Sequence, residues 1–286
     1  MNEAFDKHLT VSKDTQTLID LLSENCPQIS KQKLKLAMKY GAVWLTGKNK
    51  QNNKTVRVRR AKKELKLGDE VHLYYDESIL FADITPAKLV SDEGEYSVWD
   101  KPCGMFSQGT KWGDHSSITR WIEIFGFELN QLQPRPVFLV HRLDRATNGL
   151  VLVAHNKKMA SQLAELFENR KIEKHYSALV PGCYSPESLM QLDEGIDGRS
   201  ALTVILSSEY LSEKDQTLLS LKIETGRKHQ IRKHLAAIGH PVIGDRLYTN
   251  AEREFKNYPD LMLRSCYLKF ICPFSAQQRI YQLPSY

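Results

Sequence analysis

The sequence predicts an α+β protein with a small N-terminal α/β module and a larger domain built on a mixed sheet. Its 286 residues are enough for about two domains. From about Glu95 onward, short apolar runs alternate irregularly with helical patterns, which favours a mixed α+β domain over a regular doubly wound sheet. Residues 31–66 contain thirteen Lys and Arg but one acid, Glu64, so this segment carries +12 and the rest of the chain −6.

The composition excludes several classes of protein. With 41% apolar and 26% charged residues, the chain is neither disordered nor collagen-like. It has no apolar run of about 18 residues, and its first residues lack the apolar core of a signal peptide, so we expect no membrane association. Five cysteines without a CxxC pair argue against a disulfide framework or a cysteine-rich zinc site, and favour the cytoplasm.

The patterns divide the chain into four parts. We expect an N-terminal tail over 1–14, a module over 15–75, a linker over 76–92 and the second domain over 93–286. In the module, an apolar helical stripe begins at Leu18, and a second helix runs over Lys31–Tyr40 between the N-cap Ser30 and Gly41. Its strands are expected at Val43–Leu45, Thr55–Arg59 and Glu70–Tyr75.

The second domain shows the same two patterns on a larger scale. A helix is predicted over Lys157–Ile172, because apolar residues recur there on one side. The expected strands are Tyr96–Trp99, Val137–Val140, Leu150–Ala154, Tyr176–Val180 and Leu218–Ile223.

The densest polar cluster is the segment HRLDRATNG, residues 141–149, between two apolar runs. Two arginines and Asp144 between buried strands are costly unless their charges are paired and used. On this segment alone, a tight turn with a structural Asp–Arg pair is slightly favoured over a catalytic loop.

A second cluster, TGRKHQIRKH, covers residues 225–234. A helix is expected over Arg227–Ile238, with His229 and Arg232 projecting together from one side. An isolated basic surface helix is the alternative. The spacing lacks the HExxH arrangement and no cysteine lies near, so we expect no metal.

Taken together, these motifs resemble the RluA-type RNA pseudouridine synthases. HRLDRATNG is similar to the HRLD-x-x-TSG signature of that family, and TGRKHQIRKHLAAIGHPVIGDRLY resembles its second long motif. DKPCG at 100–104, KHYSALV at 174–180 and LMLRSCYLKFICP at 261–273 follow the family's order as well. The resemblance covers residues 95–275 and implies a mixed, largely antiparallel sheet with flanking helices.

The resemblance implies an isomerase that detaches uracil from its ribose, rotates it and rejoins it through carbon, without a cofactor. It assigns the required carboxylate to Asp144, which either adds to the sugar or removes a sugar proton. Arg232 is the expected ion-pair partner of Asp144. Tyr176 is expected to stack on the uracil and is the candidate to move the proton, although a phenol with a pKa of ~10 is a poor base.

Further residues are expected to bind the substrate: His141, Arg142, Lys101, Arg227 and His229. Because a base in structured RNA must be flipped out, Arg142 is a candidate to fill the vacated stack. His141 is expected to anchor the loop, and Lys101 to hold a phosphate.

The N-terminal module resembles an S-four-like RNA-binding module through SKQKLKLAMKYGAVWLTG and LKLGDEV. Its basic residues are expected to contact phosphates: Lys31, Lys35, Lys39, Lys48, Lys50, Lys54, Arg57, Arg59 and Arg60. This module favours large-subunit ribosomal RNA as the substrate, with transfer RNA as the alternative. We expect a monomer, and we expect that deletion of residues 1–80 leaves the second domain folded.

Two residues depart from the family pattern: Asn148 replaces a Ser, and Arg264 replaces a His. Two other functions fit the sequence less well. A non-catalytic RNA-binding or ribosome-associated factor has no need for Asp144, Tyr176 and Arg232 together. A glycosidase needs two placed carboxylates, whereas the loop offers one.

Overall fold

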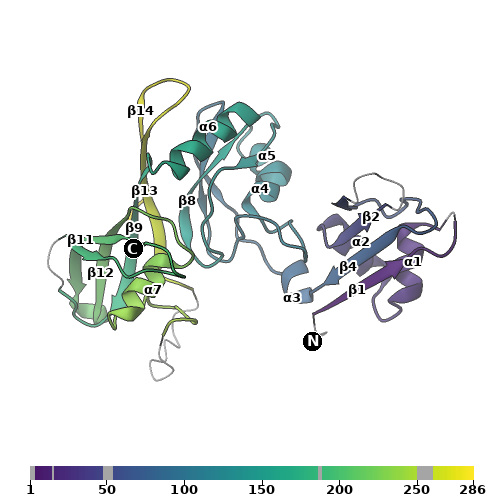
Figure 1. Ribbon diagram of the computed structural model, residues 1–286, viewed down its shortest axis with the longest axis horizontal. Coiled ribbons are helices and arrows are strands. Elements are labelled where there is room, and N and C mark those ends of the chain that lie inside the picture. Colours follow the sequence, from purple (N-terminus) through teal and green to yellow (C-terminus); the bar gives the residue numbers. More distant parts are fainter. Residues whose placement is uncertain (1–3, 15, 48–53, 186–188, 250–259) are drawn as a thin grey trace. The chain divides into compact units, whose positions relative to one another are not determined.

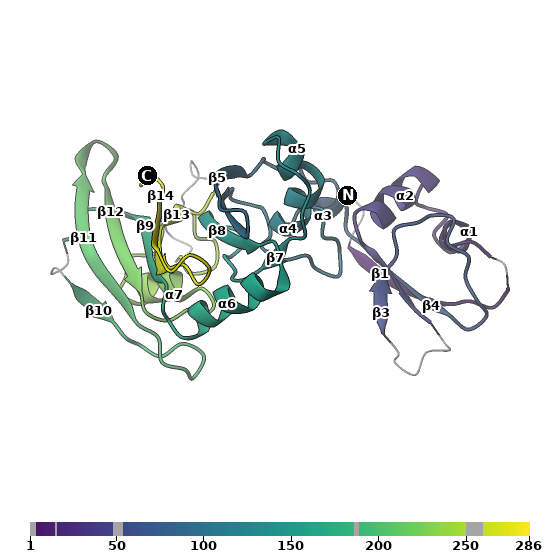
Figure 2. The ribbon, with the colours of Figure 1, turned by 90° about the horizontal axis from the view of Figure 1, so that it is seen from above.

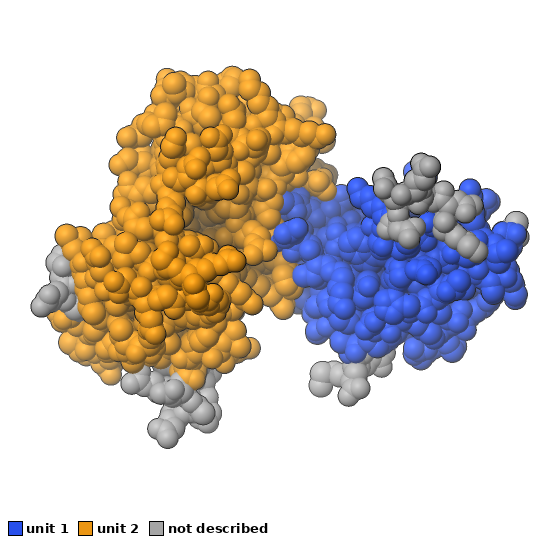
Figure 3. Space-filling view, viewed as in Figure 1, with its two compact units in different colours: residues 1–84, 108–121 blue, residues 85–107, 122–286 orange. Residues whose placement is uncertain are grey.

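The computed structural model describes residues 4–14, 16–47, 54–185, 189–249 and 260–286. The chain forms two compact units (Figure 3). Unit 1 comprises residues 1–84 and 108–121, and unit 2 comprises residues 85–107 and 122–286. Lys48 and Lys50, which we expected to contact phosphates, lie outside the described residues.

Unit 1 combines a four-stranded antiparallel sheet with four helices. The strands are β1 (Phe5–Thr10), β2 (Val43–Thr46), β3 (Thr55–Arg57) and β4 (Glu70–Tyr75), in the order β1-β4-β2-β3. The helices are α1 (Leu18–Asn25), α2 (Lys31–Lys39), α3 (Glu77–Leu80) and α4 (Ile118–Trp121). As expected, Ser30 caps α2, since its hydroxyl accepts a hydrogen bond from the Lys33 amide.

The core of unit 1 follows from the helical stripes. Leu18, Leu22, Leu34 and Met38 are fully buried, and they pack with Leu73 of β4. Their burial fixes which faces of α1 and α2 turn inward and leaves the lysines of α2 outside.

Three segments differ from the sequence-based expectation. Residues 5–10 are not a free tail but β1, which pairs along its whole length with β4. Its alternating half-buried and exposed residues are the period-two pattern of a strand. Residues 76–92 contain α3 and β5 (Lys88–Asp92), and residues 108–121 join unit 1.

Unit 2 is an α+β unit with a ten-stranded, mixed and largely antiparallel sheet, which confirms the predicted fold class. Its central path runs β10-β11-β12-β9-β13-β8-β6-β5, with β14 beside β13 and β7 beside β8 (Figures 1 and 2). Among the described strands the parallel pair is β13 with β8. Besides β5, the strands are β6 (Tyr96–Lys101), β7 (Phe138–Leu139), β8 (Asn148–Ala154), β9 (Glu173–Pro181), β10 (Met190–Leu192), β11 (Thr203–Leu211), β12 (Gln216–Ile223), β13 (Leu263–Ile271) and β14 (Gln278–Gln282).

The helices of unit 2 are α5 (Phe127–Leu129), α6 (Lys157–Glu168) and α7 (Gln230–Ala237), with a π-helical turn η1 (Ile122–Gly126) and a 3₁₀ turn η2 (Ser212–Lys214). Helix α6 packs on β8, and Met159 and Leu163 join a core with Val98, Leu152 and Phe270. The helix ends earlier than predicted, because Arg170 adopts a left-handed conformation with φ 56°.

This arrangement places three functional segments around the middle of the sheet. The 141–147 loop connects β7 to β8, Tyr176 lies on β9, and α7 follows β12. In the part of the chain that the structure describes, no helix is long and apolar enough to cross a membrane.

Candidate active site

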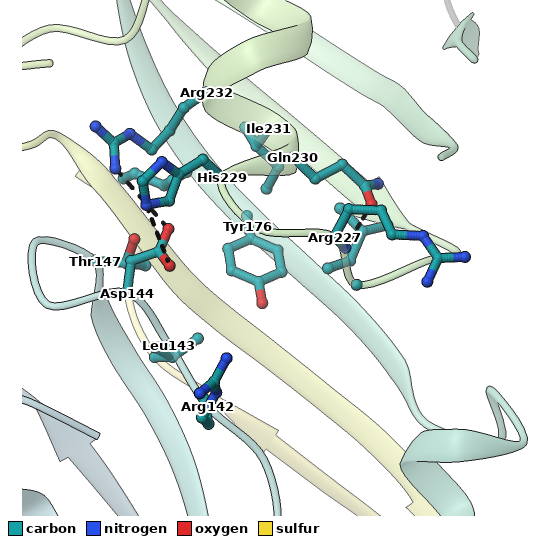
Figure 4. Close-up of a pocket in the computed structure, with 13 residues that line it drawn as sticks. Arg142, Leu143, Asp144, Thr147, Tyr176, Arg227, His229, Gln230, Ile231 and Arg232 are labelled. Atoms are coloured by element: carbon teal, nitrogen blue, oxygen red, sulfur yellow. Dashed lines mark hydrogen bonds and ion pairs between the residues drawn. The ribbon is translucent and has the colours of Figure 1, made fainter. Parts of the chain in front are cut away.

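A pocket of about 110 Å³ lies where these three segments meet (Figure 4). Its lining includes six of the residues singled out from the sequence: Arg142, Asp144, Tyr176, Arg227, His229 and Arg232. The structure therefore brings the two sequence clusters together, although more than 80 residues of sequence lie between Asp144 and His229. His141 and Lys101 do not line this pocket.

Asp144 faces two side chains of opposite or potentially opposite charge: Arg232 on α7, and His229 directly before that helix. Its Oδ1 lies 3.8 Å from Nε2 of His229, and its Oδ2 lies 4.0 Å from Nη1 of Arg232. About a third of the Asp144 side chain is exposed, 32%. The carboxylate is thus held near positive charge while remaining open to a ligand.

Arg232 has a closer partner than the one we expected. Its Nε and Nη2 donate to the two oxygens of Asp245 at 2.7 and 2.8 Å, and both side chains are almost fully buried. Asp245 also accepts hydrogen bonds from the amides of Leu247 and Tyr248. Asp245 therefore fixes the guanidinium, which leaves Nη1 turned toward Asp144.

The ionisation of this buried pair follows from its contacts. Burial pulls the pKa of Arg232 down, but the hydrogen bonds and charge of Asp245 outweigh that effect, so the pKa is raised. Burial pushes the pKa of Asp245 up, and its hydrogen bonds with Arg232 and the two amides reverse this to a lowered pKa. Both groups stay charged at neutral pH.

Tyr176 and His229 are set in the pocket by their own neighbours. Tyr176 is 9% exposed on β9, and burial raises the pKa of its phenol. His229 precedes α7 in a left-handed conformation with φ 56°, and its Nδ1 lies 2.8 Å from the Tyr248 hydroxyl. Burial lowers the pKa of His229, which favours the neutral imidazole.

Helix α7 begins at Gln230 and not at Arg227, where we expected it to begin. The side chain of Gln230 fixes this start. The Gln230 side chain accepts hydrogen bonds from the Thr225 hydroxyl and the Arg227 amide, and donates to Leu202. Arg227 uses its Nε to donate to the carbonyl of Ser200. Its guanidinium consequently points away from Asp144 (Figure 4).

Hydrogen bonds from the segment that follows β6 hold the 141–147 loop in place. The Ser107 hydroxyl donates to the carbonyl of Leu143 at 2.6 Å, and the Leu143 amide donates back to that hydroxyl at 2.9 Å. The Gly104 amide donates to the carbonyl of Arg145, and the Cys103 thiol to the carbonyl of Ala146. The DKPCG motif is therefore a support for the loop.

Two residues that we expected to bind substrate, His141 and Lys101, lie outside the pocket. Nε2 of His141 accepts a hydrogen bond from the Leu152 amide, and its ring stacks on Phe167 at 4.2 Å. Burial lowers the pKa of His141 to about 3, so the ring is neutral. His141 thus ties the loop to β8 and α6, which matches the anchoring role we expected of it.

Lys101 does not reach a surface where it can hold a phosphate. It is fully buried, and its Nζ donates to the carbonyls of Pro102, Met105 and Arg145 at 2.9–3.4 Å. A cation enclosed by carbonyls supports the turn from β6 into the loop, so its place corrects the phosphate-binding expectation.

Lys101 leads to a prediction on pH dependence. Burial lowers the pKa of Lys101 to about 8, below its ordinary value of 10.5. Between these values the unfolded chain binds a proton that the folded chain does not, so stability rises with pH by about 3 kcal/mol. We expect this rise in urea unfolding of the wild type between pH 8 and 10.5, relative to Lys101→Met. Parallel stability curves for the two proteins would contradict it.

The two departures from the family pattern lie side by side. Asn148 and Arg264 are register partners in the parallel pair of β8 and β13. Arg264 pairs with Asp100 at 2.6 Å, and Asn148 accepts a hydrogen bond from the hydroxyl of Tyr286 at 3.0 Å. Both residues thus have structural partners next to the loop.

In unit 1, the basic residues fall into two groups. Lys31, Lys35, Lys39, Lys54 and Arg60 are exposed, as phosphate contacts require. Arg57 and Arg59, in contrast, are ion-paired with Asp114 at 3.2 and 2.5 Å. The structure corrects our expectation for these two arginines, because they hold residues 108–121 within unit 1.

Sequence reasoning missed Asp245 and Tyr248 as parts of the site. Both lie in the quoted second motif, but neither periodicity nor spacing shows which buried acid meets Arg232. Among the described residues, no group of three His, Cys, Asp or Glu side chains is placed to hold a metal ion.

Comparisons with known proteins point to one family of RNA-modifying enzymes. The family described as "RNA pseudouridylate synthase" matches residues 95–237. An uncharacterized RNA pseudouridine synthase of Aquifex aeolicus is 29% identical over 83% of this chain and 78% of its own length. The tRNA pseudouridine synthase C of Vibrio vulnificus is 28% identical over 67% of this chain and 87% of its own. The ribosomal large subunit pseudouridine synthase D of Borreliella burgdorferi is 27% identical over 76% and 72%.

A solved structure shows the same fold. Human RNA pseudouridylate synthase domain containing 1 aligns with a TM-score of 0.58 at 23% identity, and covers 71% of this chain and 85% of its own. The family match spans the loop of Asp144, the strand of Tyr176 and helix α7. The chain belongs to the RluA-type RNA pseudouridine synthases and is an isomerase that modifies RNA.

Proposed function

We propose that Asp144 is the catalytic carboxylate of a cofactor-independent isomerisation of uridine in structured RNA, with large-subunit ribosomal RNA as the preferred substrate. One observation carries the assignment of Asp144. Among the described residues that line the pocket, it is the single carboxylate, and it faces Arg232 and His229. A glycosidase needs a second placed carboxylate, which this lining does not offer.

The reaction breaks the N1–C1′ bond of uridine, forms a C5–C1′ bond, and transfers the C5 proton to N1. Asp144 either adds to C1′ or removes a sugar proton, and both routes require an ionised carboxylate. Arg232 supports that state from 4.0 Å without closing a tight pair that would compete with the substrate. Because Asp245 already holds the guanidinium, no reorganisation is needed during the reaction.

Tyr176 fits the stacking role better than the proton-transfer role. Its ring lies in the pocket beside Asp144 (Figure 4). Burial raises the pKa of the phenol, so its anion is even scarcer at neutral pH than in a free tyrosine. We assign Tyr176 to the face of the uracil. Arg142, exposed at the pocket wall, is the residue we assign to the space that the flipped base leaves.

Large-subunit ribosomal RNA is preferred because of how far the alignments reach. Unit 2 holds about two thirds of the chain, and the tRNA enzyme of Vibrio vulnificus aligns over a similar share, 67%. The ribosomal enzyme of Borreliella burgdorferi aligns over 76%, which exceeds unit 2 alone. The extra length favours a substrate that also engages part of unit 1. Transfer RNA is the alternative.

The substrate is tested with purified protein and two sets of transcripts, fragments of large-subunit ribosomal RNA and transfer RNAs. Pseudouridine is mapped by carbodiimide modification and primer extension. Conversion at a position in the ribosomal fragments supports the proposal. Conversion in transfer RNA alone contradicts the ribosomal substrate, and conversion in neither set contradicts the function.

The exposed lysines of α2 give a prediction on RNA affinity. Lys31, Lys35 and Lys39 lie on one side of the helix, and the S-four-like resemblance makes them phosphate contacts. Replacing all three with Gln is expected to lower the slope of log affinity against log salt by about 2 to 3. Filter binding at several salt concentrations measures that slope.

The matched control replaces three exposed lysines of unit 2 with Gln: Lys157, Lys158 and Lys171. This variant has the same net charge as the first, so a slope that falls equally in both would show a general charge effect and would contradict a specific role for α2.

A further inference from the structure

The pocket contains one group, His229, whose position the roles assigned above do not explain. Its ring lines the pocket, and Nε2 lies 3.8 Å from Oδ1 of Asp144. The residue adopts a left-handed conformation, which is uncommon among residues other than glycine, directly before the first residue of α7. Its carbonyl accepts the hydrogen bond from the amide of Lys233, so the helix fixes this conformation.

The other ring nitrogen of His229 is also held. Nδ1 lies 2.8 Å from the hydroxyl of Tyr248, and the two rings meet edge to face at 5.6 Å between centroids. The backbone amide of Tyr248 in turn donates to Asp245. A hydroxyl that accepts from Nδ1–H leaves the lone pair of Nε2 directed into the pocket.

We propose that His229 accepts the C5 proton of the rejoined uracil, with Tyr248 as the residue that orients it. This inference rests on the proposed role of Asp144. When the C5–C1′ bond has formed, C5 is bound to C1′, the sugar carbon at which or next to which Asp144 acts. A base within about 4 Å of that carboxylate is therefore in reach of the C5 proton.

The step balances without another reactant. The C5–H bond breaks, its proton moves to Nε2 of His229, and its electron pair forms the C5=C6 double bond. The electrons of the N1=C6 bond return to N1, which takes up a proton, so the net change is one proton moved from C5 to N1. On the route in which Asp144 adds to C1′, formation of the new glycosidic bond frees its carboxylate, which then lies beside the imidazolium.

Other polar groups that line the pocket are poorer acceptors. Arg142, Arg227 and Arg232 are cations at neutral pH. The phenol of Tyr176 keeps its proton, since burial raises its pKa, whereas burial lowers the pKa of His229 and leaves its ring neutral. Asp144 competes for the same proton, and the experiment below separates the two.

The test uses the full-length protein and an RNA that the wild type converts, prepared with hydrogen or deuterium at C5 of the target uridine. His229→Gln keeps a polar side chain but cannot take the proton. We expect kcat to fall by about 10²-fold or more with little change in KM, because general-base catalysis contributes on that scale. The isotope effect on kcat should rise, since C5–H cleavage then limits the rate.

Tyr248→Phe provides a second variant that removes only the hydroxyl next to Nδ1. It is expected to lower kcat less than His229→Gln and to raise the isotope effect in the same direction. His175→Gln is the matched control, because His175 is a half-buried histidine of β9 whose ring stacks on Tyr267. Its kcat and isotope effect should equal those of the wild type.

Full activity in His229→Gln, or reduced activity with an unchanged isotope effect, would overturn the assignment of the proton to His229. In both cases an active wild type leaves the role of Asp144 standing. A wild type that converts uridine in no RNA would instead overturn the proposed function itself.

Discussion

Replacing Asp144 with Asn is expected to abolish uridine isomerisation, with a loss of about 10⁴-fold or more. The amide is nearly the same size as the carboxylate, so the loop and its supports at Ser107 and Lys101 stay in place. What is lost is the negative charge that faces Arg232 and His229. Pseudouridine formation under single-turnover conditions measures the effect.

RNA affinity should survive this change, because the proposed phosphate contacts lie in unit 1. Asp193→Asn is the matched control, since Asp193 is an exposed carboxylate of unit 2 outside the pocket. Its activity should equal that of the wild type. An Asp144→Asn variant that converts uridine at the wild-type rate would refute the catalytic role of the carboxylate.

Replacing Asp245 with Asn is expected to cost both stability and activity. The side chains of Asp245 and Arg232 are 0% and 6% exposed, so the substitution leaves a buried guanidinium without its counter-charge. Removal of one partner of such a pair costs about 3–5 kcal/mol in the free energy of unfolding. Activity should fall further than the loss of folded protein explains, because Arg232 is then free to close on Asp144.

A double variant separates the two effects. Arg232→Met combined with Asp245→Asn removes both charges, so part of the lost stability should return while activity stays low. Urea unfolding gives the stability, and kcat measured on folded protein gives the activity. If the single variant Asp245→Asn has the same free energy of unfolding as the wild type, the ion pair of Asp245 and Arg232 does not contribute to stability as predicted.

The sequence predicted well what is encoded locally. The cap at Ser30, the strand of Tyr176 and the pairing of two polar clusters in one pocket all depend on short motifs or on their family resemblance. The fold class followed from the alternation of apolar runs with helical patterns, which is a local property too.

What the sequence could not show are partners chosen by tertiary packing. Asp114 meets Arg57 and Arg59 across more than 50 residues of sequence, and nothing near either arginine indicates that acid. We expected Asp144 to be the partner of Arg232, whereas the structure pairs Arg232 with the buried Asp245, which no local pattern singles out. Lys101 was expected to hold a phosphate, whereas the carbonyls that enclose it come from turns whose shape the sequence does not reveal.

The membership of residues 108–121 in unit 1 has a consequence for how this protein can be divided or recombined. The polypeptide passes from one unit to the other at three points, near residues 84, 107 and 121, rather than through one hinge. Removing residues 1–80 would strip Asp114 of Arg57 and Arg59, and His115 of its stacking partner Tyr40. The two units are therefore interleaved in the sequence. A chimaera with one junction near residue 84 would join residues 108–121 of this chain to an N-terminal part from another protein, so the two units should be exchanged together.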